Sequence, residues 1–416
     1  MIHGRALIPL VFALLYLGLN VLIYSALKKW FGQGRYWKFT KTLFWLSLVF
    51  VFFGIVQLML RFQSPTIFPS PLSNWFIGFT FSLMIGEILF GIVLLFDRLI
   101  GLPFQIFNFI NKSPTEKRET NNGRRKFVQT TSTIVAGLPF LSMIYGITFG
   151  KYNYQVRKIV LKFPDLPEAF NGFKIAQISD IHSGSFDDKE AVLKGVKMVN
   201  DQLADLIVFT GDLVNSRSKE IVPFLDVFSQ LKAKHGVMST KGNHDYGVYY
   251  DWPNRQAQID DQVEMQNRHS ELGFDLLNNE NRTIEKNGEK INIVGVENWG
   301  LTPFPQVGDL DKALEGTENA PFTILLSHDP SHWDEVVLNH KRHIHLTLSG
   351  HTHGMQFGVD IPGLKWSPVQ YKYPRWAGLY KEKNQCLYVN RGFGFIGFPG
   401  RVGIMPEISV FELQRG

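Results

Sequence analysis

Cysteine is nearly absent from this chain, which has one such residue, Cys386, among 416. A single thiol excludes an intrachain disulfide and a metal site built from several cysteines. Cys386 lies in a strand-like run of Val, Leu and Tyr residues, which favours a buried structural thiol. The chemistry of the chain therefore has to come from other side chains.

Acidic residues are scarce in the first 150 residues, which hold 4 Asp/Glu against 14 Lys/Arg, a net charge of +10. The remainder holds 33 Asp/Glu and 29 Lys/Arg, a net charge of −4, together with eleven of the twelve histidines. The basic pI of 9.1 is therefore a property of the first part alone. It does not indicate a nucleic-acid-binding surface on the second part, and we expect no nucleic-acid partner.

Polar residues are rare in three segments of the first part, about 7–27, 43–60 and 75–96. Each approaches the ~20 apolar residues that cross a bilayer as a helix. A buried core helix is the alternative for each, but the surrounding sequence offers little to cover three of them. A fourth segment, 127–149, is a weaker candidate because it is rich in threonine and has Pro139 near its middle.

Glu87 lies in the middle of the third apolar segment. An ionisable residue at that depth is a functional hypothesis by default. No second intramembrane charge accompanies it, so we favour a structural role in which Glu87 bonds to a polar group such as Gln57.

The Lys and Arg residues of the short loops predict how these segments are oriented. The loops after the first and third segments are basic and should be cytoplasmic, whereas the loop after the second holds only Arg61 and should lie outside. If the fourth segment spans the membrane, the rest of the chain lies outside the cytoplasm; if it does not, the rest is cytoplasmic. The basic residues are Lys28, Lys29, Arg35, Lys38 and Lys41 in the first loop, and Arg98, Lys112, Lys117, Arg118, Arg124, Arg125 and Lys126 in the third.

The Arg-Arg-Lys sequence at 124–126 resembles a twin-arginine export signal, whose apolar region is only mildly hydrophobic. The alternative is the ordinary basic flank of a spanning helix. Both interpretations send the following domain outward, and without a small-x-small cleavage site we expect an uncleaved anchor. The predicted organisation is three transmembrane helices with basic cytoplasmic loops in 1–126, a fourth helix or twin-arginine-like anchor in 127–150, and a separate domain in 151–416.

Beyond residue 150, strand-like and helix-like runs alternate. Residues 150–171 are typical of a linker and an edge strand, and residues 188–203 and 219–232 have helical spacing. This alternation predicts a two-sheet sandwich flanked by helices. The expected strands are 173–179, 206–209, 237–238, 291–296, 322–326, 344–348, 386–389 and 408–412.

Histidine, carboxylate and amide side chains follow directly after several of these apolar runs. Each group is short and weak alone, but all five in this order are a specific signal. In an α/β layout, residues that follow the carboxyl ends of strands gather into one site. The groups are Asp180-Ile181-His182, Gly211-Asp212, Gly242-Asn243-His244-Asp245, Ser327-His328-Asp329 and Gly350-His351-Thr352-His353-Gly354.

These five groups resemble the metal-ligand motifs of the calcineurin-like metallophosphoesterase superfamily. The resemblance covers roughly 155–415, and residues 166–182, 387–392 and 406–408 are similar to its membrane-associated bacterial branch. It implies a four-layer αββα sandwich, here preceded by an all-α transmembrane region, in a bacterial inner membrane. The loop charges and a spanning fourth segment would place the catalytic domain outside the cytoplasm. One departure is Met355, where many relatives of this branch carry a glycine, and it concerns the rim of the pocket.

The resemblance also implies two divalent metal ions about 3.5–4 Å apart. Mixed imidazole and carboxylate ligation favours Mn, Fe or Zn. Each metal takes three ligands of its own, and one carboxylate bridges the pair. The implied ligands are Asp180, His182 and His353 for one metal, Asn243, His328 and His351 for the other, and Asp212 as the bridge.

His244 is not an implied metal ligand. It is expected to donate to the phosphoryl oxygens or to protonate the leaving group. Asn243 serves beside it as a neutral ligand, and Asp245 either orients the imidazole or is a solvated or capping residue. Thr352, in an extended backbone, should let the flanking histidines point to opposite sides. The glycines at 211, 242 and 350 should allow sharp turns.

The implied activity is hydrolysis of phosphodiester or pyrophosphate bonds by a metal-bridged hydroxide. We expect a phosphate-ester or lipid-linked phosphate substrate and contact with membrane lipids. Alternatives are a soluble nucleotide or phosphomonoester phosphatase, a nucleotide-diphosphate-lipid pyrophosphatase facing the cytoplasm and, more remotely, a non-catalytic binding scaffold.

Aromatic residues between 355 and 400 bear on the substrate. Phe393, Phe395 and Phe398 alternate with glycine or isoleucine, a spacing typical of an exposed and flexible lip. An apolar lip on a tethered domain would suit an amphipathic substrate. Arg391 and Arg401 in the same segment are expected to be surface or ion-paired residues, with contact to a phosphate as the alternative.

Overall fold

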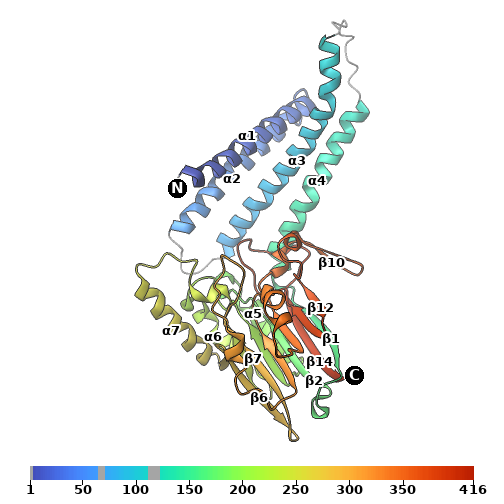
Figure 1. Cartoon of the computed structure of the whole chain (residues 1–416). Helices are drawn as coiled ribbons and strands as arrows, with labels where there is room; N and C mark the ends of the chain where they lie inside the picture. Colours follow the sequence, from blue (N-terminus) through green and yellow to red (C-terminus); the bar gives the residue numbers. More distant parts are fainter. Residues whose placement is uncertain (1–2, 64–70, 111–121) are drawn as a thin grey trace. The chain divides into compact units, whose positions relative to one another are not determined.

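The computed structural model describes residues 3–63, 71–110 and 122–416, which form two units. Among the described residues, the first unit consists of the helical segments 3–63 and 75–145. The second consists of 71–74 and 146–416 and contains the sheets (Figure 1). The predicted basic residues Lys112, Lys117 and Arg118 lie outside the described residues.

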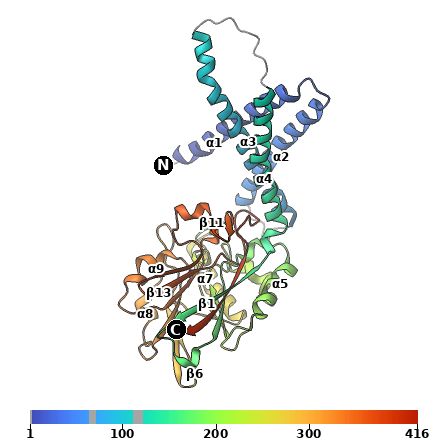
Figure 2. The ribbon, with the colours of Figure 1, turned by 90° about the vertical axis from the view of Figure 1, so that its right-hand side faces the viewer.

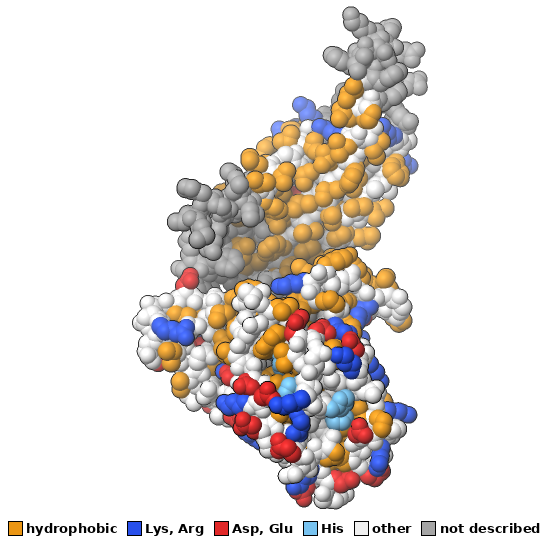
Figure 3. Space-filling model, viewed as in Figure 1, with side chains coloured by type: hydrophobic (Ala, Val, Ile, Leu, Met, Phe, Trp, Pro, Cys, Tyr) orange, Lys and Arg blue, Asp and Glu red, His pale blue; other side chains and the backbone are white. Residues whose placement is uncertain are grey.

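Four helices of the first part are long and apolar enough to cross a membrane, within the described ranges. The weaker fourth segment is among them, although whether it spans remains a prediction. Hydrophobic side chains cover much of the face of this unit that Figure 3 shows, and many large ones on its helices are exposed. This is the pattern of helices that face lipid rather than water. The helices are α1 (His3–Phe31), α2 (Trp37–Gln63), α3 (Pro71–Ile110) and α4 (Asn122–Thr148).

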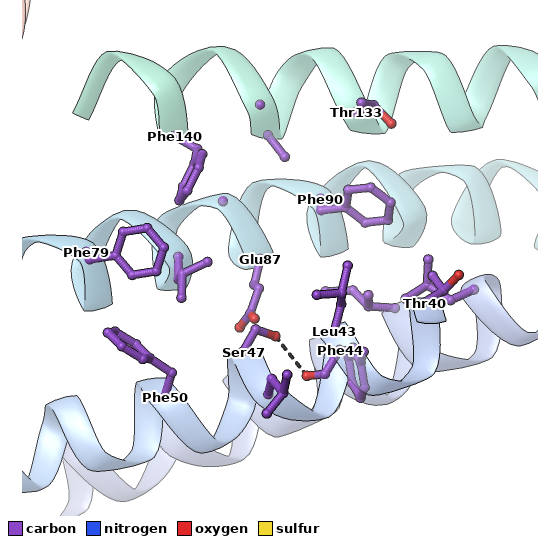
Figure 4. A pocket seen from close by; sticks show the side chains of 17 residues that line it. Thr40, Leu43, Phe44, Ser47, Phe50, Phe79, Glu87, Phe90, Thr133 and Phe140 are labelled. Atoms are coloured by element: carbon purple, nitrogen blue, oxygen red, sulfur yellow. Dashed lines mark hydrogen bonds between the residues drawn. The ribbon is translucent and has the colours of Figure 1, made fainter. Parts of the chain in front are cut away.

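Glu87 faces the inside of this helical unit. Its carboxylate accepts a hydrogen bond from the Tyr16 hydroxyl, so the observed partner comes from α1. Figure 4 shows the Ser47 side chain beside Glu87, in a cavity of about 590 Å³ lined by all four helices and mostly by apolar side chains. A hydrogen bond that joins α1 to α3 is consistent with the structural role that we favour for Glu87.

The first six-stranded sheet of the second unit has the order β1-β14-β2-β3-β4-β5. From β2 to β5 the strands are parallel, whereas β14 is antiparallel to β2 and parallel to the edge strand β1. The strands are β1 (Gln155–Phe163), β2 (Phe173–Ile178), β3 (Leu206–Thr210), β4 (Val237–Thr240), β5 (Phe274–Leu276) and β14 (Glu407–Arg415).

The second six-stranded sheet has the order β12-β13-β9-β8-β7-β6. Its four inner strands are parallel, and its two edge strands are antiparallel to their neighbours. The strands are β6 (Glu280–Lys286), β7 (Glu289–Gly295), β8 (Phe322–Leu326), β9 (Leu346–Ser349), β12 (Gly378–Glu382) and β13 (Gln385–Val389). A separate antiparallel hairpin joins β10 (Val359–Ile361) to β11 (Leu364–Trp366).

The alternation of side chains along each strand builds three apolar layers. Leu206 and Val208 of β3 pack between the sheets, whereas Ile207 and Phe209 face the helices of the first sheet. In the second sheet, Leu325 faces outward with Trp333. The order is therefore helices, sheet, sheet, helices (Figure 2), which confirms the four-layer αββα fold. The helices are α5 (Lys189–Asn200), α6 (Leu225–Phe228) and α7 (Arg255–Glu271) on one face and α8 (Leu310–Ala313) and α9 (Ser331–Glu335) on the other.

The helix predicted over 219–232 is only partly correct. The segment forms a 3₁₀ helix, Ser218–Phe224, followed by the four residues of α6. Pro223 lies inside this segment and supplies no backbone N–H, which disfavours a continuous α-helix.

Candidate metal centre

Five strands deliver polar side chains to one place. Asp180, Asp212 and Asn243 follow the ends of β2, β3 and β4, which are parallel neighbours in the first sheet. His328 and His351 follow the ends of β8 and β9, which are parallel neighbours in the second. The carboxyl ends of both sheets therefore contribute to the same cluster, as expected for an α/β site.

Seven of the predicted site residues fall into three overlapping groups whose ligand atoms lie within 4.8 Å of one another. Asp212 belongs to two of the groups and so lies between them. Most of these residues are buried, and His244 is half-buried. The groups are Asp180, His182 and His353; His182, Asp212 and His244; and Asp212, His328 and His351.

The backbone at this cluster is in an unusual conformation. Five non-glycine residues have φ between 47° and 72°, the left-handed region that L-residues rarely adopt. Each such residue costs on the order of 1 kcal/mol or more, and such strain gathers at functional sites. The residues are Asp180, His182, Asp212, His351 and His353.

Hydrogen bonds between the turns hold their strained backbone in place. The Asp180 N–H donates to the Gly211 carbonyl over 2.8 Å, and the His182 N–H donates to the Asp212 carbonyl over 3.0 Å. The His351 N–H donates to both oxygens of the Asp180 carboxylate, at 2.9 and 3.1 Å. Motifs far apart in sequence therefore form one hydrogen-bonded frame.

At two positions glycine is required because a carboxylate lies too close for a Cβ atom, and not because the backbone needs a positive φ. A Cβ at Gly242 would lie 2.2 Å from Asp212 Oδ1, and a Cβ at Gly350 would lie 2.2 Å from Asp180 Oδ2. Gly211 alone of the three predicted turning glycines has a positive φ, 92°. The expectation that all three allow sharp turns is therefore correct only for Gly211.

The two histidines of the last motif diverge for a different reason from the one predicted. The backbone is left-handed at His351, right-handed at Thr352 (φ −80°, ψ −23°) and left-handed again at His353. It is not extended, so the alternation of conformations separates the two rings.

His328 is positioned as a ligand would be. Its Nδ1–H donates to the Thr210 carbonyl over 2.7 Å, which leaves Nε2 to face Asp212 Oδ2 at 3.1 Å. Burial lowers the pKa of His328, but the charge of Asp212 outweighs it and raises that pKa to about 10. In turn, burial raises the pKa of Asp212, but His328 and His244 hold it well below its usual range. A cation bound between them would take the place of the His328 proton, because an imidazole has to be deprotonated to bind a metal.

The second pair of rings is neutral. His182 Nε2 lies 2.9 Å from His353 Nε2, and the latter is 3.2 Å from Asp180 Oδ1. Burial lowers the pKa of His182 to about 3 and holds that of His353 well below 6.5. Burial also raises the pKa of Asp180 to about 7. Neutral imidazoles that converge with a carboxylate are the form that binds a divalent metal.

His351 and Asn243 face each other. His351 Nδ1 lies 2.9 Å from Asn243 Oδ1, while the ring's Nε2 lies 2.8 Å from the Tyr373 hydroxyl. The Asn243 amide nitrogen donates to the Tyr249 hydroxyl over 2.8 Å, so its oxygen is turned toward the cluster. Burial lowers the pKa of His351 to about 4.

The cluster fits divalent metal binding on the chemistry of its donors. His328 Nε2 and Asp329 Oδ2 are buried and have no hydrogen-bond partner in the described part of the chain. Buried carboxylates and imidazole lone pairs that face one centre need a cation to offset their desolvation. Mixed nitrogen and oxygen donors suit Mn, Fe or Zn better than Ca or Mg.

Asp245 does not orient the His244 imidazole. Its carboxylate accepts hydrogen bonds from the backbone N–H groups of Asp212, Leu213 and Gly242 at 2.8–2.9 Å. His244 Nδ1 lies instead 2.6 Å from the Asn215 carbonyl. The structure therefore makes Asp245 a buried positioning residue for the turn that carries Asp212, and its pKa is raised to about 7 by burial.

We predict that Asp245→Asn lowers the free energy of unfolding by about 1–3 kcal/mol, because an amide N–H₂ would oppose a buried backbone donor. Denaturant unfolding of the second unit, compared between the variant and the parent chain, measures this change. Asp188→Asn is the matched control, since Asp188 is an exposed N-cap that accepts from Ala191 N and asparagine caps equally well. Equal effects in the two variants would contradict the role of Asp245.

The predicted aromatic lip is wrong for Phe393 and Phe395, whereas Phe398 is half-buried. Phe393 and Phe395 are buried in the core beneath the first sheet, where Phe393 stacks near Tyr154 with ring centroids 4.4 Å apart. Arg391 is ion-paired with Glu407, as expected. Arg401 is neither exposed nor ion-paired: it is fully buried, donates to backbone carbonyls and lies 3.2 Å from His353 Nδ1.

Sequence reasoning missed the residues that contact and orient the predicted ligands. Tyr249 and Tyr373 contact Asn243 and His351, and Asp329 Oδ2 lies 3.4 Å from His351 Nε2. Asp329 follows His328 in the same motif, so its position in the sequence could have indicated that it lies near the site. The tyrosines lie in loops that carry no motif of their own.

Comparisons with known proteins agree with this architecture. Residues 4–151 match the family model "Probable Calcineurin-like phosphoesterase, transmembrane domain", and residues 173–355 match the model "Calcineurin-like phosphoesterase". A Bacillus subtilis relative, "Uncharacterized metallophosphoesterase YkuE", is 30% identical over 60% of this chain and 82% of its own. A Danio rerio relative, "Transmembrane protein with metallophosphoesterase domain", is 27% identical over 78% of this chain and 71% of its own.

Among solved structures, the NAD nucleotidase of Haemophilus influenzae is similar with a TM-score of 0.37 and 15% identity, over 53% of this chain and 45% of that one. The sequence relatives carry the assignment. The chain is a membrane protein with a metallophosphoesterase domain, and it belongs to the calcineurin-like metallophosphoesterase family.

Proposed function

We propose that this protein is a membrane-anchored di-metal phosphoesterase that hydrolyses phosphodiester or pyrophosphate bonds of an amphipathic, envelope-associated substrate. The observation that carries the proposal is the overlap of three mostly buried ligand groups, of which two share Asp212 and two share His182. Shared carboxylates are how proteins hold two metals close enough to act on one phosphoryl group.

In this proposal Asp180, His182 and His353 would hold one metal, and a second set would hold the other. Asp212 could serve both, since its Oδ2 lies 3.5 Å from His182 Nε2 and 3.1 Å from His328 Nε2. The second set is Asn243, His328 and His351. When bound, the metals would neutralise phosphate charge and lower the pKa of the attacking water.

His244 is the proposed proton donor to the phosphoryl or leaving-group oxygen. His244 is half-buried, as His351 is, so it can face an incoming substrate. The Asn215 carbonyl accepts a hydrogen bond from Nδ1–H, which leaves Nε2 to face the site. Nε2 can donate a proton when the ring carries protons on both nitrogens. The backbone N–H of His244 donates to Asp212 Oδ1 over 2.8 Å and ties the ring to the bridging carboxylate.

The location is also a proposal. With α4 spanning and the loops oriented by their basic residues, the domain lies outside the cytoplasm of a bacterial inner membrane. A cytoplasmic domain would instead favour the nucleotide-diphosphate-lipid alternative.

Hydrolysis of bis-p-nitrophenyl phosphate against p-nitrophenyl phosphate by the full chain, in detergent with added Mn²⁺, tests the bond type. We expect the diester to be the better substrate by about tenfold or more in kcat/KM, a difference of about 1.4 kcal/mol. Preferred turnover of the monoester or of free nucleotides would favour the soluble-substrate alternative and overturn this proposal.

A further inference from the structure

An exposed apolar surface follows directly after the last metal motif. Its hydrophobic side chains come from the β10–β11 hairpin and from the segments that join it to the domain. Six large exposed hydrophobic residues within 17 positions form more than the isolated exposures that are normal on a protein surface. They are Met355, Phe357, Ile361, Leu364, Trp366 and Tyr371.

The hairpin has one apolar and one polar face, and the apolar face is the one that is exposed. Val359 pairs with Trp366 and Ile361 pairs with Leu364, so these four side chains share one face of the two strands. Ile361, Leu364 and Trp366 are 58%, 53% and 36% exposed. The apolar face of the hairpin is therefore turned away from the protein.

The polar face is the one that binds the domain. Asp360, paired with Lys365 in the ladder, forms ion pairs with Arg157 at 2.5 Å and Arg391 at 3.0 Å. Lys365 Nζ donates to the Ala377 carbonyl and lies 5.0 Å from the centre of the Trp376 ring. Figure 1 shows the hairpin projecting from the sheets. These contacts fix its orientation, so the outward apolar face is a built feature.

The root of the hairpin is connected to the end of α4. Gly358 N donates to the Val402 carbonyl over 2.9 Å, and the adjoining Arg401 N donates to the carbonyl of Gly146 over 3.2 Å. Gly146 lies in the last turn of α4 and belongs to the second unit. A Cβ at Gly146 would lie 2.7 Å from the Arg401 carbonyl oxygen, so the two segments are in close contact.

The hairpin is equally close to the metal centre along the chain. Met355 stands two residues after the proposed ligand His353, and it is the departure from related sequences noted above. On the other side, a 3₁₀ helix, Pro368–Tyr371, leads to Tyr373, whose hydroxyl contacts His351 Nε2. The apolar surface is thus inserted between two residues of the site.

We propose that the apolar face of the β10–β11 hairpin inserts into the bilayer interface and presents a membrane-embedded phospholipid or lipid-linked phosphate to the metal centre. A lipid surface is favoured over a protein partner because of where the hairpin is attached. Gly358, before the hairpin, is hydrogen-bonded to Val402, and the adjoining Arg401 is hydrogen-bonded to Gly146 at the end of a candidate membrane span. Trp366, which lies on the apolar face, is also a residue type that is enriched at membrane interfaces. The substrate class rests on the phosphoesterase function proposed above, whereas the insertion does not.

Site-directed fluorescence on the full chain in phospholipid nanodiscs tests the insertion. Leu364→Cys and Ile361→Cys would carry an environment-sensitive label, and the parent chain measures background because its one cysteine, Cys386, is buried. Leu203→Cys is the matched control, because Leu203 is 83% exposed and lies at the opposite end of β3 from the metal centre. We expect spin-labelled lipids to quench the two hairpin labels at least about twofold more than the control.

Equal quenching at the hairpin and at Leu203 would overturn the proposal. A hairpin label that is shielded from water but not quenched by lipid would also overturn it, and would indicate a protein partner or a second copy of the chain. The label reports insertion without turnover, so failure here is distinct from a failure to hydrolyse diesters.

Discussion

Asp212→Asn is expected to reduce phosphodiester turnover by about 10³-fold or more, a loss of about 4 kcal/mol of transition-state stabilisation. Asp212 is the carboxylate shared by two ligand groups, and its negative charge faces His182 and His328. Asparagine keeps an oxygen that can accept from His244 N, so the fold is retained. It removes the charge that would hold two cations together. Turnover of bis-p-nitrophenyl phosphate by purified full-length protein measures the effect.

Asp311→Asn is the matched control, because Asp311 has an exposed side chain on α8 and belongs to none of the three ligand groups. It should retain the activity of the parent chain. Metal content measured on both variants should fall only in Asp212→Asn. If Asp212→Asn kept substantial turnover with a full metal content, the assignment of Asp212 as the bridge would be wrong.

His244→Asn is expected to lower kcat by about 10²–10⁴-fold, the usual contribution of a positioned general acid. Both metals should remain bound, because His244 is proposed to act on the substrate rather than on the metals. His343→Ala is the histidine control: His343 is exposed and lies at the opposite end of β9 from His351, and its loss should leave kcat unchanged. The measurement is kcat together with metal stoichiometry in the same preparation.

The metal content distinguishes this role from ligation. His244 lies in one of the three groups of possible ligand atoms, with His182 and Asp212. If His244→Asn lost a metal ion in parallel with its activity, His244 would be a ligand. A loss of activity with both metals in place would leave it as the proton donor.

Much of the fold could be predicted from the sequence because burial imposes a simple pattern. Strands such as β3 and β8 are continuous apolar runs, since parallel strands are covered on both faces, and the predicted 322–326 coincides with β8. The five motifs were visible because each follows such a run directly. Their convergence then follows from the parallel order of the strands.

Other features could not be predicted because they depend on tertiary contacts. The burial of Phe393 and Phe395 is set by their packing against Tyr154 and Phe186, and their glycine-rich spacing resembles an exposed loop. The role of Asp245 depends on backbone N–H groups of a distant turn. The exposed face of the hairpin depends on the ion pairs of Asp360, which the alternation of residues alone does not reveal.

The most direct test of the two-metal account is a metal titration of the full chain after removal of bound ions by chelation. We predict no diester hydrolysis without metal, and recovery of activity with Mn²⁺ that saturates at about two equivalents per chain. Hydrolysis that persists in the fully chelated protein, or saturation at one equivalent with full activity, would contradict the account.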